Sequence, residues 1–170
     1  MDLRSRILIN LYDLRPFPLR GDAGVGDADP ECDISCVINF YGRANLLRVI
    51  LTGLAEQGYD KKRFEVVLVE DRGGTDEGRG ISGEFESVLN MRYYALEENF
   101  GVMGYARNFG LGRTRGKYVL FLDDDTVITD RGFISKLIRE LEEGDAEAVI
   151  PRGSASYCLL KGRYSFHDPY

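Results

Sequence analysis

Short apolar runs alternate with segments of helical spacing along most of this chain. Four runs contain the β-branched or aromatic residues that are typical of strands, and they span residues 34–38, 64–69, 91–96 and 146–150. A fifth run, Tyr118–Leu122, is continuous and predicts a strand buried on both faces. We therefore expect five strands between residues 34 and 150.

Helical spacing fills most of the gaps between these strands. Apolar residues between 46 and 55 recur on one helical face, with Asn45 as the predicted N-cap and Gly58 as the stop. A second helix is predicted over 102–114. A third is predicted between Asp130, as its cap, and Gly144, where it ends.

Glycines mark two segments of this pattern. Residues 72–83 contain five glycines and are predicted as a loop, followed by a short helical piece over 84–89. Gly110 and Gly112 fall inside the predicted helix over 102–114, where each costs about 1 kcal/mol relative to alanine. We expect that helix to pack closely against the sheet.

The two ends of the chain lack this alternation. Residues 7–12 fit either a short strand or one helical turn, and the Gly- and Pro-rich stretch 21–30 predicts a linker. A boundary near Glu31 separates residues 1–30, an N-terminal extension and linker, from a domain over 31–170. No clear period is found over 152–170.

The order of these elements predicts the fold class. Strands that alternate with helices indicate an α/β protein with a mainly parallel sheet and helices on both faces. The 170 residues favour a single domain. In such sheets, ligands bind beyond the carboxyl ends of the strands, so the residues that follow each strand become the candidates for function.

Composition narrows the function classes. The 22 basic and 28 acidic residues give a net charge of −6, which argues against nucleic-acid binding but not against a nucleotide bound through a metal. The three cysteines, Cys32, Cys36 and Cys158, show no metal-ligand spacing, and we expect them to be reduced. With no membrane-spanning apolar stretch and no signal peptide, the prediction is a cytoplasmic protein.

Three carboxylates, Asp123, Asp124 and Asp125, follow directly after the run Tyr118–Leu122. Like charges at this spacing repel, and desolvating each one is costly. A divalent cation such as Mg²⁺ or Mn²⁺ is a favourable partner, because hard cations prefer carboxylate oxygens. The alternative is a solvated acidic turn that caps the next helix, and this stretch alone does not decide between the two.

Polar residues follow the other predicted strands. The first strand ends near Asn39 and Tyr41, and the second ends at Asp71. Tyr41 offers a stacking face or a hydroxyl, Asp71 an acceptor for a ring N–H or ribose hydroxyls, and Arg107 a countercharge for phosphate. With a metal on Asp125, this set would hold a base, a ribose and a diphosphate. The structural alternatives are packing for Tyr41, a glycine turn for Asp71 and a surface position for Arg107.

Other nucleotide-binding classes fail on particular residues. A dinucleotide-binding Rossmann unit needs G-x-G-x-x-G after a strand, but residues 39–43 read Asn-Phe-Tyr-Gly-Arg. The P-loop pattern G-x-x-x-x-G-K-[ST] is absent from the sequence. A phosphoacceptor receiver domain would have an acidic pair after the first strand, where this chain has Asn39 and Phe40.

Four stretches then carry a family resemblance: 34–43 (ISCVINFYGR), 64–71 (FEVVLVED) with 74–76 (GTD), 98–101 (ENFG) with 106–110 (ARNFG), and 115–125 (RGKYVLFLDDD). Their order and spacing over residues 32–150 resemble the nucleotide-binding half of a family-2 glycosyltransferase. The resemblance implies the GT-A fold, of the nucleotide-diphospho-sugar transferase type and incomplete at the C-terminus. One departure is Asn-Phe-Tyr-Gly-Arg at 39–43, where the family commonly has Pro-Thr-Tyr-Asn-Arg.

The resemblance also implies roles. Asn39 and Tyr41 would border the nucleobase, and Asp71 would contact the base or ribose. The run Asp123–Asp125 would be the DxD-type motif, with Asp125 binding Mg²⁺ or Mn²⁺ and Asp123 or Asp124 binding the ribose or the metal. The implied reaction moves a sugar, with inversion, from a nucleotide diphosphate donor to an acceptor hydroxyl. We favour a UDP-sugar, and leave the acceptor open among sugar, lipid and protein.

In the family, the acceptor site and the general base usually lie in a half that follows the DxD motif. We therefore expect this chain to be a truncated donor-binding half, and assign no catalytic base, since Asp145, Glu147 and Asp168 match no motif. A truncated, non-catalytic module that binds a nucleotide-sugar or a partner is the alternative. An uncovered apolar surface near 146–150 predicts self-association or a partner. Peripheral membrane association is left open.

Overall fold

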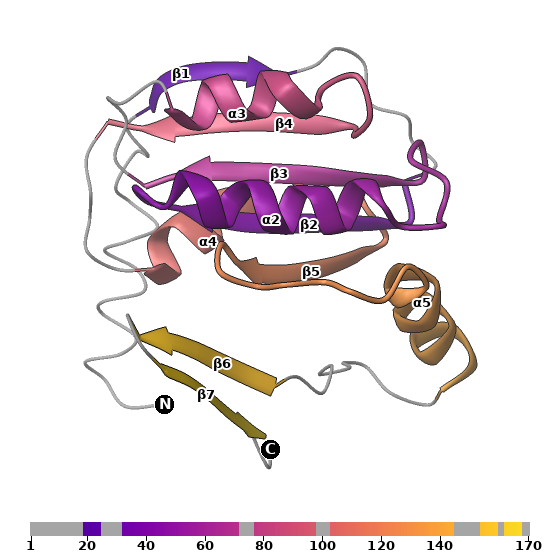
Figure 1. The fold of residues 1–170 in the computed structure, drawn as a ribbon. Helices are drawn as coiled ribbons and strands as arrows, with labels where there is room; N and C mark the ends of the chain where they lie inside the picture. The colour runs from indigo at the N-terminus through magenta and orange to yellow at the C-terminus, as the bar shows by residue number, and fades with distance from the viewer. Residues whose placement is uncertain are drawn as a thin grey trace, which may run out of the picture. The chain divides into compact units, whose positions relative to one another are not determined.

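The computed structural model describes residues 32–71, 77–97 and 103–144, together with the strands Leu19–Gly24, Ser154–Leu159 and Gly162–His167. The chain divides into two compact units, Met1–Gly132 and Phe133–Tyr170, and Figure 1 labels the elements of both. Within the described ranges, no helix combines the length and the apolar character needed to cross a lipid bilayer.

A five-stranded sheet forms the centre of the first unit, with the strand order β1-β4-β3-β2-β5 (Figure 1). Strands β2, β3, β4 and β5 run parallel, whereas β1 pairs antiparallel with β4. The bounds are β1 Leu19–Gly24, β2 Ile34–Phe40, β3 Phe64–Glu70, β4 Met91–Leu96 and β5 Tyr118–Asp123. The predicted α/β class with a mainly parallel sheet is confirmed.

Helices cover both faces of this sheet. α2 (Ala44–Ala55) and α3 (Glu77–Phe85) lie on one face, and α4 (Met103–Leu111) packs on the other (Figure 1). The assignment follows from strand alternation, because Glu70 and Tyr93 face α3 whereas their neighbours Val69 and Tyr94 face α4. The core face of α2 is made by residues that are fully buried: Leu47, Ile50, Leu51 and Leu54.

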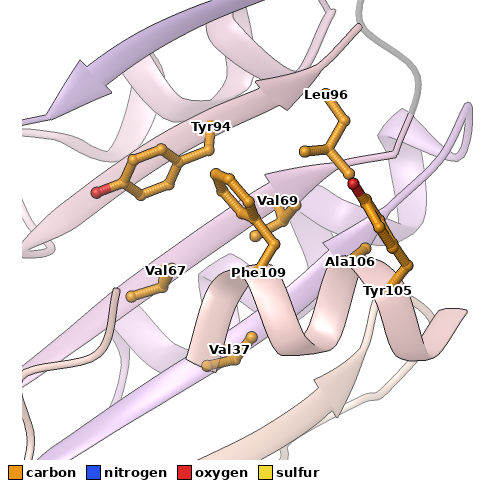
Figure 2. Close-up of a cluster of buried hydrophobic side chains, with 8 residues drawn as sticks. All are labelled: Val37, Val67, Val69, Tyr94, Leu96, Tyr105, Ala106 and Phe109. Atoms are coloured by element: carbon orange, nitrogen blue, oxygen red, sulfur yellow. The ribbon is translucent and has the colours of Figure 1, made fainter. Parts of the chain in front are cut away.

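The core under α4 joins that helix to the three central strands. Figure 2 shows Phe109 and Tyr105 of α4 directed at side chains of β2, β3 and β4. The Phe109 ring meets the edge of Tyr94 with 5.5 Å between the ring centroids. A Cβ on Gly110 would lie 2.6 Å from Cγ1 of Val37. The expected close packing at Gly110 is therefore present.

A buried polar network ties the loop before β5 to the amino ends of β2, β3 and β4. The Ser35 hydroxyl donates to Oε1 of Glu65 at 2.6 Å, and Nη2 of Arg92 pairs with Oε2 of Glu65 at 2.9 Å. The backbone N–H of Gly116 donates to Oγ of Ser35 at 2.7 Å. Each buried charge is thus paired, as burial requires, and the start of β5 is placed beside β2.

Two glycine predictions need correction. Residues 72–83 are not all loop, because α3 begins at Glu77, and it ends at Phe85 instead of covering 84–89. Gly78 is buried in that helix against Glu70 and Tyr93, where a Cβ would collide with both side chains. Tertiary packing thus outweighs the low helix propensity of glycine. Gly112 lies beyond α4, which ends at Leu111, so it is not a helix-interior glycine.

The predicted N-caps and the predicted end of the first helix are also wrong. Arg43, not Asn45, is the N-cap of α2, and it makes no side-chain cap bond. The helix ends at Ala55, before Gly58, whose N–H donates to the carbonyl of Arg131 at 2.8 Å. Asp130 accepts from the N–H of Gly132 at 2.8 Å, in the turn before the next helix, so it caps that turn.

Two strands differ from their predicted environment. β5 is not buried on both faces, since it ends the described sheet and leaves Phe121 43% exposed. β1 extends into the predicted linker over 21–30, because its backbone pairs with β4 at the opposite edge. Strand pairing of this kind uses backbone groups, which glycine and aspartate also supply.

The second unit contains α5 (Phe133–Glu143) and a two-stranded antiparallel hairpin, β6 (Ser154–Leu159) with β7 (Gly162–His167). The predicted end of the helix at Gly144 is confirmed. The hairpin lies within residues 152–170, where the sequence shows no clear period. The predictions for residues 7–12 and 146–150, and the boundary at Glu31, lie outside the described residues.

Candidate functional site

A pocket of about 330 Å³ lies at the carboxyl ends of β2, β3 and β5. Its lining comes from three strand ends that are far apart in sequence: Asn39, Phe40, Tyr41, Arg43, Asp71, Asp123, Asp124 and Asp125. The convergence expected from the parallel pattern is therefore observed. The polar groups gather here because parallel strands release their carboxyl ends at one edge of the sheet.

The end of β2 supplies one wall. Asn39 pairs in register with Val69 of β3 and with Asp123 of β5, so it sits between the other two strand ends. Tyr41 follows the strand, lines the pocket and is 45% exposed. Gly42 has φ +63, and this left-handed turn leads the chain from the strand into α2.

The end of β3 supplies a second wall. The N–H of Asp71 donates to the carbonyl of Phe40 at 2.8 Å, which continues the β2–β3 pairing past the strand. The preceding Glu70 is buried and accepts a hydrogen bond from the Tyr93 hydroxyl. This bond fixes the end of β3 against β4, and so holds Asp71 at the pocket.

The acidic run occupies the turn after β5. The N–H of Thr126 donates to the carbonyl of Asp123 at 3.0 Å, which closes a tight turn around the next two aspartates. Within this turn Asp124 points inward and its side chain is 3% exposed. The side chains of Asp123 and Asp125 are each 52% exposed. Three adjacent carboxylates thus divide into one buried group and two accessible ones.

Arg43 is a charged residue of the pocket that the sequence patterns did not single out. Its Nη2 lies 2.5 Å from Oδ1 of Asp124, and its Nη1 lies 3.0 Å from Oδ2 of Asp125. One guanidinium therefore bridges both carboxylates. The available signal was the position of Arg43, directly after the polar end of the first strand, but no local pattern indicates a partner 82 residues away.

Arg107 reaches the acidic run from α4. Its Nη2 lies 2.6 Å from Oδ1 of Asp123, and its side chain is 36% exposed. Arg107 does not line the pocket itself, but it pairs with Asp123, which does. The structure thus brings together all of the predicted site residues, six in the lining and Arg107 beside it.

Burial and charge act in opposite directions on Asp124. Desolvation raises the pKa of its carboxyl above the usual value, while Arg43 and a hydrogen bond from the Tyr41 backbone lower it. The net direction is upward. Arg43 therefore opposes the effect of burial on the Asp124 carboxylate.

The described residues fit a cation that is completed by a ligand, not one enclosed by protein. No group of three or more acidic, histidine or cysteine side chains in the described ranges is arranged to hold a metal. Mg²⁺ is commonly bound by one or two carboxylates together with substrate phosphates and water. Asp125 meets that requirement, because its half-exposed carboxylate lines the pocket.

Comparison with known proteins gives a family match. The model of "Glycosyl transferase family 2" matches residues 35–160, which is most of the chain and includes every residue of the pocket.

Two relatives illustrate the extent of the similarity. Poly(ribitol-phosphate) beta-N-acetylglucosaminyltransferase TarS of Staphylococcus aureus is 35% identical over 94 residues, covering 55% of this chain and 16% of TarS. Glycosyltransferase GlyA of Streptococcus pneumoniae is 31% identical over 134 residues, covering 79% of this chain and 18% of GlyA. The chain thus spans less than a fifth of the length of either relative.

Solved structures share the fold. Residues 1–349 of S. aureus TarS in complex with UDP-GlcNAc superpose with a TM-score of 0.61 at 31% identity, covering 65% of this chain and 31% of that one. The mannosyltransferase PcManGT of Pyrobaculum calidifontis, in complex with GDP-Man and Mn²⁺, gives a TM-score of 0.57 at 19% identity. It covers 82% of this chain and 39% of that one.

Proposed function

Because this chain belongs to glycosyl transferase family 2, we propose that its pocket binds a nucleotide diphosphate sugar and serves transfer of the sugar to an acceptor hydroxyl. The observation that carries the proposal is the meeting of Tyr41, Asp71 and Asp125 in one pocket at the carboxyl ends of the sheet. A base, a ribose and a diphosphate each need a different kind of group, and this pocket offers all of them.

The donor's nucleoside would lie between the ends of β2 and β3. Asn39 and Tyr41 would border the base, and Asp71 would accept from a ring N–H or from ribose hydroxyls. A UDP-sugar is the donor we favour. Structures of the related TarS with UDP-GlcNAc and with UDP, each 31% identical to this chain, support that choice.

The diphosphate would lie over the turn after β5. Asp125 would hold Mg²⁺ or Mn²⁺ through a carboxylate oxygen, with Asp123 as a further oxygen donor to the metal or ribose, and Asp124 beside them. The cation, when bound, supplies Lewis-acid stabilisation of the departing diphosphate. Arg107 would add a fixed positive charge beside that group. Inversion would follow from attack of the acceptor on the face opposite the diphosphate.

A second candidate function is binding without turnover. It is favoured by one observation: every carboxylate that lines the pocket in the described part of the chain already has a donor-side role, namely Asp71 and the run Asp123–Asp125. No described lining carboxylate then remains as the general base for an acceptor hydroxyl. Under this alternative the chain would bind the nucleotide-sugar, or a partner, and leave it unchanged.

Calorimetric titration with UDP tests donor binding. We expect UDP to bind in the presence of Mn²⁺ and much more weakly in EDTA. Asp125→Ala should abolish the metal-dependent part, because it removes the accessible carboxylate oxygen. Arg48→Ala is the matched control. Nη2 of Arg48 lies 2.7 Å from Oε1 of Glu84, and neither residue lines the pocket, so this variant should leave UDP binding unchanged. If Asp125→Ala binds UDP as tightly as the wild type, the acidic run is a solvated turn.

A further inference from the structure

The side chain of Arg43 crosses from one structural element to another. Its backbone belongs to the start of α2, where its carbonyl accepts from the N–H groups of Leu46 and Leu47, both at 3.0 Å. Its side chain makes no bond to the helix end that it caps. The guanidinium reaches instead to the turn after β5. The backbone of Arg43 therefore bonds to α2, while its side chain bonds to the acidic turn.

The two carboxylates held by Arg43 differ in accessibility. Asp124, at 2.5 Å from Nη2, is 3% exposed and also receives the Tyr41 backbone N–H. Asp125, at 3.0 Å from Nη1, is 52% exposed and lines the pocket. A planar guanidinium offers separate N–H donors to the two. Its bond to Asp125 can therefore open to solvent while its bond to Asp124 remains.

Nη1 of Arg43 is bonded to the carboxylate that is proposed to bind the cation. Nη1 contacts Oδ2 of Asp125, the carboxylate that would hold Mg²⁺ or Mn²⁺. A divalent cation and a guanidinium cannot both sit on that carboxylate without repulsion between them. A cation bound to Asp125 would therefore weaken the contact of Nη1 with Oδ2, and the released donor would need a new acceptor in the pocket.

We propose that Arg43 is a positioning residue that couples cation binding to donor binding: it keeps Asp125 paired until a diphosphate arrives to accept the released guanidinium arm. This inference rests on the proposed function of the pocket. Asp124 holds the guanidinium close throughout the exchange. The released Nη1 donates to a phosphate oxygen, a charge-assisted contact that forms only when diphosphate and cation are both present.

Charge balance supports this coupling. The turn carries three carboxylates and receives two guanidinium groups, from Arg43 and Arg107. A cation bound alone would be opposed by both guanidinium groups, and Arg43 would be left with one unused arm. A diphosphate removes both costs, since it neutralises the added positive charge and accepts the free N–H. Cation and nucleotide should therefore bind much better together than separately.

The first test measures Mn²⁺ alone, by calorimetry or electron paramagnetic resonance, with no nucleotide. Arg43→Ala and Arg43→Gln should bind Mn²⁺ more tightly than the wild type, on the order of tenfold, because a competing positive charge is gone. Arg43→Gln keeps a hydrogen-bonding group near Asp124 and so separates the loss of charge from the loss of contact. Arg43→Lys should bind Mn²⁺ about as tightly as the wild type, because it keeps the positive charge, but a lysine cannot bridge both carboxylates.

The second test measures the coupling. The factor by which UDP tightens Mn²⁺ binding should fall on the order of tenfold in Arg43→Ala and Arg43→Gln, and partly in Arg43→Lys. Arg48→Ala removes an exposed arginine of the same helix, paired with Glu84 at 2.7 Å, and should change neither quantity. Thermal unfolding of each variant, with and without EDTA, checks that the fold is retained.

The outcomes separate the two proposals. If the wild type binds UDP with Mn²⁺ but the folded Arg43 variants show unchanged or weaker Mn²⁺ binding and unchanged coupling, Arg43 is only a surface ion pair and this inference is wrong. If the wild type shows no Mn²⁺-dependent UDP binding, the proposed function itself fails, and the inference falls with it. Tighter Mn²⁺ binding with reduced coupling in the variants supports both.

Discussion

Asp124 and Asp125 are neighbours in sequence but lie in opposite environments, since their side chains are 3% and 52% exposed. Burial makes Asp124 a fixed anchor for Arg43, and exposure makes Asp125 available to a ligand. A substitution of Asp124 should therefore release Arg43, whereas a substitution of Asp125 should remove a carboxylate that is accessible to a ligand. At the residue scale, chemistry in this protein follows from which way each side chain points, more than from which residue type is present.

Gly116 illustrates a position decided by close approach. A Cβ there would lie 2.5 Å from the backbone nitrogen of Ser35 and 2.6 Å from the backbone carbon of Ile34. Gly116→Ala should therefore lower the free energy of unfolding by about 1–3 kcal/mol, as overpacking against backbone does. Urea unfolding checks this. Gly80→Ala is the control, because no atom lies within 4 Å of its Cβ position in α3, and it should be neutral or slightly stabilising.

Asp33 gives a pH prediction away from the pocket. A hydrogen bond from Arg63 at 2.6 Å, and another from Tyr59, lower the pKa of Asp33 below its usual 3.8. A lowered pKa contributes stability above the unfolded-state value, and this is lost as the pH falls through the folded-state value. Asp33→Asn should thus be less stable at pH 7 by up to about 1 kcal/mol. The difference should shrink below pH 3.8, as measured by urea unfolding across pH; a constant difference would contradict the assignment.

At the scale of elements, α4 joins the core to the site. Its buried face, with Phe109 and Ala106, packs on β2, β3 and β4 (Figure 2). Arg107, between these two residues in sequence, pairs with Asp123. The helix can approach the sheet this closely because Gly110 has no side chain against Val37. The position of Arg107 at the acidic turn therefore depends on how α4 packs.

Truncating Phe109 should test how much the packing of α4 on the sheet contributes to stability. Phe109 is fully buried and meets Tyr94 edge to face, so Phe109→Ala should lower the free energy of unfolding by about 3–5 kcal/mol. Phe109→Leu, which fills most of the volume, should cost much less. Thermal and urea unfolding measure both variants. Equal stability of Phe109→Ala and wild type would show that α4 does not anchor the sheet.

At the scale of the whole molecule, the pocket lies entirely within the first compact unit, Met1–Gly132. Under the proposed function, donor recognition would therefore draw on one folded region. With the roles proposed above, the described lining offers no further carboxylate for acceptor activation. Under the proposed function, donor binding and sugar transfer would then be separable.

We expect the purified chain to bind UDP with Mn²⁺ and to transfer little or no sugar. Loss of general-base assistance alone lowers rates by about 10²–10⁴-fold. Release of UDP from UDP-GlcNAc, measured with and without candidate acceptors, checks this. Rapid transfer would contradict this expectation and would favour turnover over binding alone.

The local pattern of residues was enough to predict the parallel sheet and the position of the site. Buried strands are identified by their own apolar residues, and parallel strands place their carboxyl ends together, so Asn39, Asp71 and Asp125 were predicted to converge from position along the chain alone. The same local pattern located β4 over Met91–Leu96.

Only the tertiary structure decided the features that depend on contacts between distant segments. Local propensity favoured a loop at Gly78, yet packing against Glu70 and Tyr93 places it in α3. The run Tyr118–Leu122 reads as buried, yet β5 ends the described sheet and exposes Phe121. Arg43 is unremarked in its own segment and becomes the bridge between Asp124 and Asp125 because α2 and β5 both begin or end at the pocket. The sequence determines which side chains lie at the carboxyl edge of the sheet. Which of them pair and which are buried depends on contacts between distant segments, so the tertiary structure decides it.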